Sequence, residues 1–212
     1  MSKNTWEPKL PPFVKHKKKV FKNAFLTANI IYQIGESTLL REKSQNVPIE
    51  LINSKNFKQK IKYIKECLKK YRKLTGTGRG ISAIQIGILE RFSVVYMPEI
   101  KGKYLILINP KIIKTSKKYL KYPEICMSAF PVIAPVTRPS WIEFEYYDEK
   151  GVRRYWNRKN DTKTNKIYNR VFQHELDHMD GIINIDRVES RELTLESDPK
   201  FYEKAKFEET TP

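Results

Sequence analysis

The chain has 212 residues, and 41 Lys and Arg against 24 Asp and Glu give it a formal net charge of +17. Hydrophobic residues make up 40% and aromatic residues 12% of the sequence, which predicts one folded domain and excludes a disordered chain. No stretch approaches the roughly 18–20 apolar residues of a membrane helix, and the first residues lack the apolar segment of a secretory signal. We therefore expect a protein that is neither secreted nor attached to a membrane.

The cysteine count bears on the redox compartment of the protein, and the charge bears on its binding partners. Cys67 and Cys126 are too few for a disulfide framework, which predicts free thiols in a reducing compartment. The basic charge has two interpretations. It can reflect a Lys-rich composition, since 30 of the 41 basic residues are Lys, or it can indicate a polyanionic partner such as RNA.

The two ends of the chain differ from its middle. Residues 1–24 carry seven Lys against one Glu, and three prolines interrupt any early helix, so we expect a basic, mobile N-terminal extension. Residues 191–212 are charged and show little apolar patterning, which predicts a tail with few core contacts. The single catalytic domain is then expected over residues 25–190.

Periodicity predicts the elements between these ends. Apolar residues recur at spacings of three and four from Phe57 to Tyr71, which predicts an amphipathic helix over residues 57–74 with Lys on its outer face. Strand-like patterns follow over residues 91–97, 104–108, 141–147 and 152–156, the last two joined by a hairpin turn. Helical spacing returns over residues 164–179, with Gly181 as its expected C-terminal cap. We expect an α+β fold in which central antiparallel or mixed sheets pack around this later helix, with the amphipathic helix before them.

The later helix carries an H-E-x-x-H motif. His174 and His178 lie four residues apart, so one helix face can present both imidazoles to one cation. Glu175 follows the first His and is placed to take a proton from a water molecule without binding the ion. The motif predicts a metal-dependent hydrolase, and the third ligand decides which kind.

Two sources of a third ligand remain open from the residues alone. No His follows within the six residues after His178, which argues against the metzincin pattern. A downstream carboxylate, as in thermolysin-like enzymes, would have to come from the charged tail, where Glu189, Glu192 and Glu196 are available. The other source is Cys126, whose thiolate with two imidazoles would leave one position open for water.

A glycine-rich segment precedes the strands. It runs from Gly78 to Gly87 and lacks the Lys-Ser/Thr pair of a P-loop, so by itself it indicates little more than a tight turn. Its Gln85 carries an amide that could donate a hydrogen bond to an oxygen that becomes negative during catalysis.

Three segments in this order resemble those of peptide deformylases. The family has the patterns G-x-G-x-[AS]-A-x-Q-x-G, E-G-C-x-S and H-E-x-D-H. Here they correspond to Gly78–Gly87, Glu124–Ser128 and His174–His178, and the run Gly35–Arg41 is similar to an early G-D-x-x-L-R stretch of the family. The resemblance covers roughly residues 30–188.

The resemblance implies a specific activity and a specific site. It implies removal of the N-formyl group from the starting methionine of new peptides, with one divalent metal ion: Fe(II) in the cell, and Zn(II) or Ni(II) as possible substitutes. The implied residues are the metal ligands Cys126, His174 and His178, the general base Glu175, and the oxyanion donors Gln85 and the backbone N–H of Met127. Substrate contacts are expected at Gly80, Arg79, Ile125 and Val171.

Two positions depart from the family pattern. Ile125 stands before the Cys where the family usually has Gly, and Arg79 stands where the family usually has an apolar residue near the methionine pocket. These departures keep a second hypothesis open, a divergent deformylase with altered peptide specificity. Two further hypotheses are an H-E-x-x-H metalloprotease with a downstream Glu and a metal-free binding module.

The expected setting follows from the same resemblance. The partners are formylated nascent peptides, and the basic surface could also hold the protein near ribosomal RNA. Formylated initiation places the protein in a bacterial cytoplasm or in an organelle, and we expect a monomer.

Overall fold

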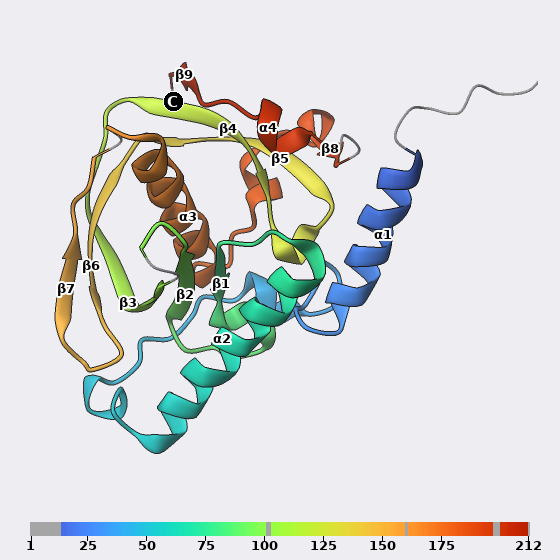
Figure 1. Cartoon of the computed structure of the whole chain (residues 1–212). Helices are drawn as coiled ribbons and strands as arrows, with labels where there is room; N and C mark the ends of the chain where they lie inside the picture. Colours follow the sequence, from blue (N-terminus) through green and yellow to red (C-terminus); the bar gives the residue numbers. More distant parts are fainter. Residues whose placement is uncertain (1–13, 101–102, 160, 197–199, 212) are drawn as a thin grey trace, which may run out of the picture.

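The computed structural model describes residues 14–100, 103–159, 161–196 and 200–211 (Figure 1). The first 13 residues of the expected N-terminal extension lie outside the described residues. The fold is α+β, as predicted, with two antiparallel sheets and few helices. Within the described part of the chain, no helix has both the length and the apolar character that a membrane span requires.

The larger sheet has five strands in the order β1-β2-β3-β6-β7, all antiparallel. The strands are β1 (Gly80–Ser82), β2 (Phe92–Met97), β3 (Lys103–Thr115), β6 (Ile142–Tyr147) and β7 (Arg153–Trp156). The predicted strands all occur, although β3 continues well beyond residue 108 because its exposed second half still pairs with β6.

The smaller sheet has the order β8-β5-β4-β9. Its strands are β4 (Tyr119–Ile125), β5 (Val132–Pro139), β8 (Thr194–Leu195) and β9 (Glu208–Thr210). Residues 191–212, expected to be a charged tail with few core contacts, add two strands to this sheet, because β8 pairs with β5 and β9 pairs with β4. Backbone hydrogen bonds anchor these two strands even though their side chains are exposed, a kind of contact that apolar patterning does not reveal.

Two helices cover opposite faces of the larger sheet. Helix α2 (Lys55–Thr75) begins at the side-chain cap of Ser54 and ends at Gly76, whose positive φ closes the last turn. It packs with Phe92 and Val94 on one face, and α3 (Lys163–Met179) packs with Val95 and Phe144 on the other. Figure 1 shows α3 enclosed between the two sheets, which places its His-bearing C-terminal half in the centre of the molecule.

The described part of the N-terminal extension is a helix, α1 (Val14–Ala28). Residues 14–24 are therefore helical, where we expected a mobile arm. Val20 and Thr27 are buried at a spacing of seven, and α1 lies against α2 (Figure 1). Short helices complete the fold: α4 (Phe201–Lys204), η1 (Thr38–Arg41), η2 (Ile49–Leu51), η3 (Ala83–Ile86), η4 (Met127–Ala129), η5 (Asn184–Arg187) and η6 (Ser190–Glu192).

Candidate metal centre

Three metal-ligating side chains converge at the end of β4. Cys126 follows that strand directly, and His174 and His178 project from adjacent turns of α3. One ligand atom of each lies within 4.8 Å of the others, and Cys126 Sγ is 3.2 Å from His178 Nε2. Because one sulfur and two ring nitrogens form a donor set that suits Zn²⁺ or Fe²⁺, the residues fit a divalent transition metal.

A contact from outside the ligand set orients the His174 imidazole. Glu124 Oε2 lies 3.0 Å from His174 Nδ1, which leaves Nε2 of that ring for a cation. Burial would lower the pKa of His174, but contacts with Cys126 and Glu124 outweigh it and raise the pKa well above its usual value. Burial and the neighbouring His174 lower the pKa of His178 well below its usual value.

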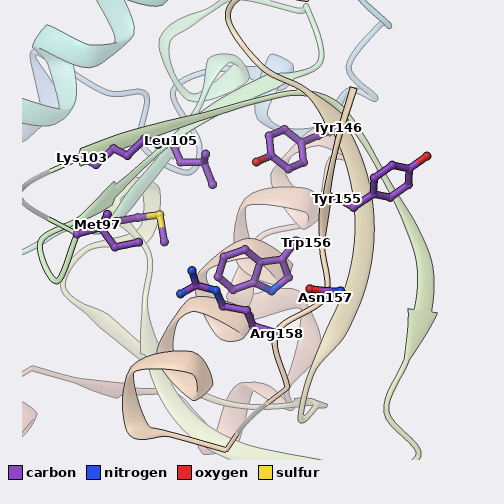
Figure 2. Close-up of a pocket in the computed structure, with 9 residues that line it drawn as sticks. Met97, Lys103, Leu105, Tyr146, Tyr155, Trp156, Asn157 and Arg158 are labelled. Carbon is purple, nitrogen blue, oxygen red and sulfur yellow. The ribbon is translucent and has the colours of Figure 1, made fainter. Parts of the chain in front are cut away.

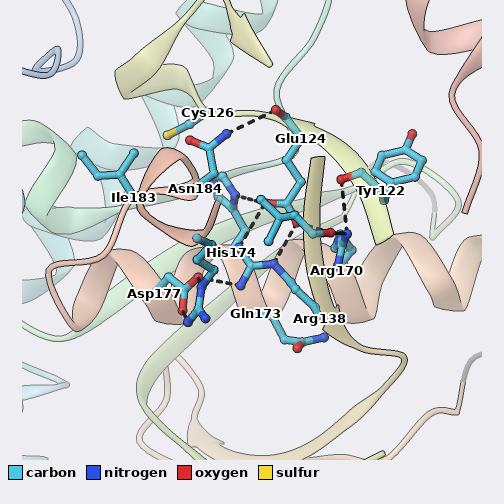
Figure 3. Close-up of polar contacts among 12 residues, drawn as sticks. Tyr122, Glu124, Cys126, Arg138, Arg170, Gln173, His174, Asp177, Ile183 and Asn184 are labelled. Carbon is cyan, nitrogen blue, oxygen red and sulfur yellow. Dashed lines mark hydrogen bonds and ion pairs between the residues drawn. The ribbon is translucent and has the colours of Figure 1, made fainter. Parts of the chain in front are cut away.

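A buried network of charges holds Glu124 in place. Figure 3 shows Arg138 reaching Glu124, with N···O distances of 2.8 and 3.0 Å, and Asp177 at 2.5 Å. Arg170 Nε lies 2.7 Å from Glu124 Oε1. Burial alone would raise the pKa of Glu124, but the charges of Arg138 and Arg170 lower it well below its usual range. The carboxylate thus stays ionised and ready to accept from His174.

The acid of the motif, Glu175, points away from this network toward β1. It is 2% exposed, and Ser82 Oγ lies 2.8 Å from its Oε2. Burial raises the pKa of Glu175 to about 7, against the opposing charge of His174. A carboxyl group with a pKa near neutral pH can both take up and release a proton. A Cβ on Gly80 would lie 2.2 Å from Glu175 Oε1, so the β1 backbone forms one wall of this carboxyl's niche.

Gln85 reaches the centre from η3. Its Oε1 accepts a hydrogen bond from the Ser82 N–H at 2.8 Å, which turns its Nε2 toward Ser128 Oγ at 2.9 Å and Cys126 Sγ at 4.0 Å. Met127 is buried and follows Cys126 directly in η4. The structure therefore gathers Gln85 and Met127 beside the three ligands, as the motifs predicted, and adds Ser82 and Ser128, which the sequence did not single out.

Three of the four expected substrate residues adjoin residues of this centre, and the fourth, Arg79, is the neighbour of one of them. Gly80 touches Glu175, Ile125 precedes Cys126, and Val171 lies one turn before His174 on α3. Arg79 precedes Gly80, and its Nη1 is 3.0 Å from both carboxylate oxygens of Glu99. Their roles toward substrate stay predictions.

The downstream carboxylates occupy other contacts. Glu192 pairs with Lys121 at 3.3 Å, Glu196 lies 3.8 Å from His16, and Glu189 pairs with Arg191 at 2.7 Å. Among the described residues, the metal-capable cluster consists of Cys126, His174 and His178, without any of these three. The arrangement of a metalloprotease with a downstream Glu ligand is therefore not formed.

The residues that sequence reasoning missed are those of the charge network. Glu124 and Asp177 fall inside the sequence motifs, but their partner Arg138 comes from β5, a strand the periodicity did not predict. A buried Arg in a β-strand, facing two motif carboxylates, is recognisable only once β4 and β5 are paired.

A separate cavity of about 220 Å³ lies at another part of the larger sheet. Figure 2 shows its walls, which come from β2, β3, β6, β7 and the residues that follow β7. None of the metal-ligating residues lines it, so it is not part of the metal centre.

Comparison with known proteins agrees with this geometry. A sequence model of the polypeptide deformylase family matches residues 28–194. A peptide deformylase of Picosynechococcus is 34% identical over 171 residues, covering 74% of this chain and 88% of that protein. A chloroplastic peptide deformylase 1B of rice is 35% identical over 137 residues, covering 63% of this chain and 48% of that protein.

Solved structures agree as well. The crystal structure of a Synechococcus elongatus peptide deformylase in complex with actinonin has a TM-score of 0.63 at 28% identity, covering 76% of this chain and 79% of that one. A plant peptide deformylase has a TM-score of 0.65 at 27% identity, covering 76% and 81%. The chain therefore belongs to the peptide deformylase family, metal-dependent amide hydrolases that remove the formyl group from the N-terminal methionine of new peptides.

Proposed function

We propose that Cys126, His174 and His178 hold one divalent metal ion and that Glu175 is the general base of deformylation. The convergence of the three ligand atoms within 4.8 Å, with the Glu175 carboxyl on the next residue of α3, is the observation that carries this proposal. A bound divalent ion supplies Lewis acidity and lowers the pKa of a water molecule. Fe(II) is our proposed ion in the cell, with Zn(II) or Ni(II) able to take its place.

The protein's own residues account for the proton and charge movements. Glu175 takes the proton of the attacking water and returns it to the departing amine nitrogen, a double use that its pKa of about 7 permits. The formyl oxygen becomes negative as its carbon turns tetrahedral. The Gln85 amide, fixed by Ser82, and the backbone N–H of Met127 are our proposed donors to that oxygen.

A formyl-methionyl peptide is the substrate that we propose, with Gly80, Ile125, Val171 and Arg79 near it. Arg79 is the position that most favours altered specificity, because a charged side chain stands where the family has an apolar one. Its charge is already paired with Glu99, which in turn contacts the Tyr168 hydroxyl. Since this pairing removes the need for an acidic substrate group, an apolar methionine side chain remains compatible with the site.

Formate release from formyl-Met-Ala-Ser by anaerobically prepared protein tests the activity. We expect turnover by the wild type and its loss in Glu175→Ala, with metal content retained. Comparison with formyl peptides that start with other residues tests the specificity. A preference for a different first residue would favour the hypothesis of a divergent deformylase over that of an ordinary one.

Metal analysis tests the ligand set. Cys126→Ala should lose the bound metal, whereas the matched variant Cys67→Ala, at the other buried free cysteine, should keep it. Retention of metal by Cys126→Ala would contradict the proposed ligand set, and a metal-free wild type would favour a binding module.

We also propose that the protein works as a monomer near the ribosome, in a bacterial cytoplasm or an organelle. A basic groove of about 530 Å³ lies between α2 and the turn that follows β6; Lys58, Lys62, Lys65, Lys69 and Lys150 line it together with Glu66 and Glu149. Phosphate contacts there would make binding fall steeply with salt.

Co-sedimentation with ribosomes over a salt series tests this partner. Lys62→Gln/Lys65→Gln/Lys69→Gln should weaken binding and reduce the slope of log K against log salt by roughly two to three. Lys111→Gln/Lys114→Gln/Lys117→Gln, a matched set of exposed lysines on and after β3, should not. Binding that is absent, independent of salt or equally affected by both sets would contradict an RNA contact through α2.

A further inference from the structure

Strand β4 runs directly into the metal centre, and its two edges have different partners. One edge pairs with β5 along its whole length. The other pairs with β9, in the register Tyr119↔Thr210, Leu120↔Glu209 and Lys121↔Glu208. Continued by one residue, this register sets Phe207 opposite Tyr122, and the two rings are stacked with their centroids 4.4 Å apart. The segment before β9 therefore follows the β4 edge toward the metal centre and stops at Tyr122.

The proline pair between β4 and β5 shows which backbone groups point to the β9 edge. Pro123 lies opposite Pro135, and because neither has an N–H, these two residues cannot exchange backbone hydrogen bonds. Hydrogen-bonded and non-hydrogen-bonded pairs alternate along antiparallel strands. The polar backbone groups of Tyr119, Lys121 and Ile125 therefore point away from β5. Those of Tyr119 and Lys121 meet β9, whereas those of Ile125 lie beyond it.

The stretch of this edge from Pro123 to Ile125 leads directly to Cys126. A peptide whose formyl group reaches the metal centre can extend along it by adding a strand, with Ile125 as its first backbone partner. Such a peptide would run antiparallel to β4, in the same direction as β9. Lys121 and Ile125 are four residues apart, or about 13 Å along a strand, so about three peptide residues fit before the edge is occupied.

We propose that β9 and Phe207 end the peptide groove, so that the enzyme binds only about the first three residues of a formylated chain along β4. This inference rests on the proposed function. It concerns residues beyond 194, where the family match ends, and therefore a feature of this chain rather than of the matched domain. The fourth residue of a peptide would lie opposite Tyr122, a place that Phe207 already occupies, and the peptide must leave the sheet there.

Two substitutions open the groove in different ways, and each has a matched control. Phe207→Ala removes the ring, and Phe25→Ala removes an exposed ring on α1. Glu208→Pro removes a backbone N–H that, by the register, points to Lys121. Its control is Glu209→Pro, because the backbone N–H of Glu209 points away from β4. The substrates are formyl-Met-Ala-Ser and formyl-Met-Ala-Ser-Ala-Ala, and kcat/KM is measured for each.

The expected result is a change in the ratio of the two kcat/KM values. In the wild type and both controls the longer peptide should gain little beyond its third residue. In Glu208→Pro its kcat/KM should rise about fivefold, the factor that one net backbone hydrogen bond contributes once Lys121 is free to pair with the peptide. In Phe207→Ala, which opens space opposite Tyr122 without freeing a backbone group, its kcat/KM should also rise, while that of formyl-Met-Ala-Ser is unchanged in both variants. An unchanged ratio in both opened variants would overturn the proposal, as would an equal change with both substrates, which indicates a structural role.

Binding of the deformylated peptides separates this proposal from the catalytic one. Fluorescence anisotropy of Met-Ala-Ser and Met-Ala-Ser-Ala-Ala, each labelled at the C-terminus, reports on the groove without turnover. Tighter binding of the longer peptide by the opened variants supports the stop at Phe207 even where no formate is released. No binding of either peptide, or the same affinity ratio in all variants, overturns it.

Discussion

The backbone of Gly80 lies directly against the carboxyl group of Glu175. A Cβ atom at Gly80 would sit 2.2 Å from Glu175 Oε1 and 2.6 Å from its Cδ, much closer than side-chain atoms approach one another. The other carboxyl oxygen is 2.8 Å from Ser82 Oγ, so residues of β1 fix the carboxyl from two directions. The glycine-rich motif thus shapes the niche that holds the acid of the H-E-x-x-H motif.

Gly80→Ala should consequently impair catalysis more than folding. The methyl group displaces the end of a flexible side chain rather than backbone, so the fold can accommodate it by moving the Glu175 carboxyl. A misplacement of about 1 Å typically costs about 10²-fold in rate. We expect kcat for formyl-Met-Ala-Ser to fall by that factor, with the melting temperature and metal content close to wild type. Wild-type activity in this variant would show that the carboxyl position does not matter.

Gln85→Glu tests the oxyanion donor while keeping the shape of the side chain. The new carboxylate can still accept from the Ser82 N–H, but it replaces the amide donor beside Cys126 with a negative charge. Loss of one such donor costs about 10²–10³ in kcat. Ser128→Ala removes only the 2.9 Å contact that holds the amide and should cost less. The measurement is kcat at saturating peptide, and equal losses in both variants would argue against a direct role of the amide.

The residues of the centre could be predicted because each belongs to a local pattern. Two histidines four residues apart on one helix can bind the same cation without a contribution from any other element. Cys126 could be predicted because it lies in the Glu124–Ser128 motif. The helices over residues 57–74 and 164–179 occur within two residues of their predicted bounds because their apolar spacing is regular.

The unpredicted parts depend on contacts between distant segments. β4 and β5 contain Pro123, Pro135 and Glu124, residues that rarely mark a strand, and they are stable as strands because they pair with each other. Helix α1 was missed because its Lys-rich outer face hides a narrow buried stripe that includes Val20. Strand β9 is wholly exposed, and only its backbone pairing to β4 defines it.

Arg138→Met should destabilise the protein strongly. Arg138 is 2% exposed and pairs with Glu124 and Asp177, so its loss leaves two buried carboxylates without this cation. Breaking a buried ion pair from one side costs about 3–5 kcal/mol. Urea unfolding should show that decrease in the free energy of unfolding. Arg191→Met, which breaks an exposed pair with Glu189, should change it by less than about 1 kcal/mol. Arg170 also pairs with Glu124, and Arg187 also pairs with Asp177, so a small effect of Arg138→Met would mean that these two cations suffice for the carboxylates.

The pair of Arg79 and Glu99 predicts a pH-dependent contribution to stability. Burial alone would raise the pKa of Glu99, but hydrogen bonds from Tyr168 and Arg79 outweigh it, so the pKa lies below its usual value. The unfolded chain therefore binds this proton more readily than the folded one. The contribution is present above the ordinary pKa of a Glu and is lost as the pH falls through the lower, folded value.

Glu99→Gln removes this contribution and its pH dependence together. At pH 7 the free energy of unfolding should drop by less than about 1 kcal/mol, because the pair is partly exposed and screened. The difference from wild type should shrink as the pH is lowered below 4.5, which urea unfolding at several pH values measures. Glu50→Gln, an exposed carboxylate on η2, serves as the matched control for removal of one negative charge. A difference that stays constant with pH would show that Glu99 acts through packing or hydrogen bonding that its protonation does not alter.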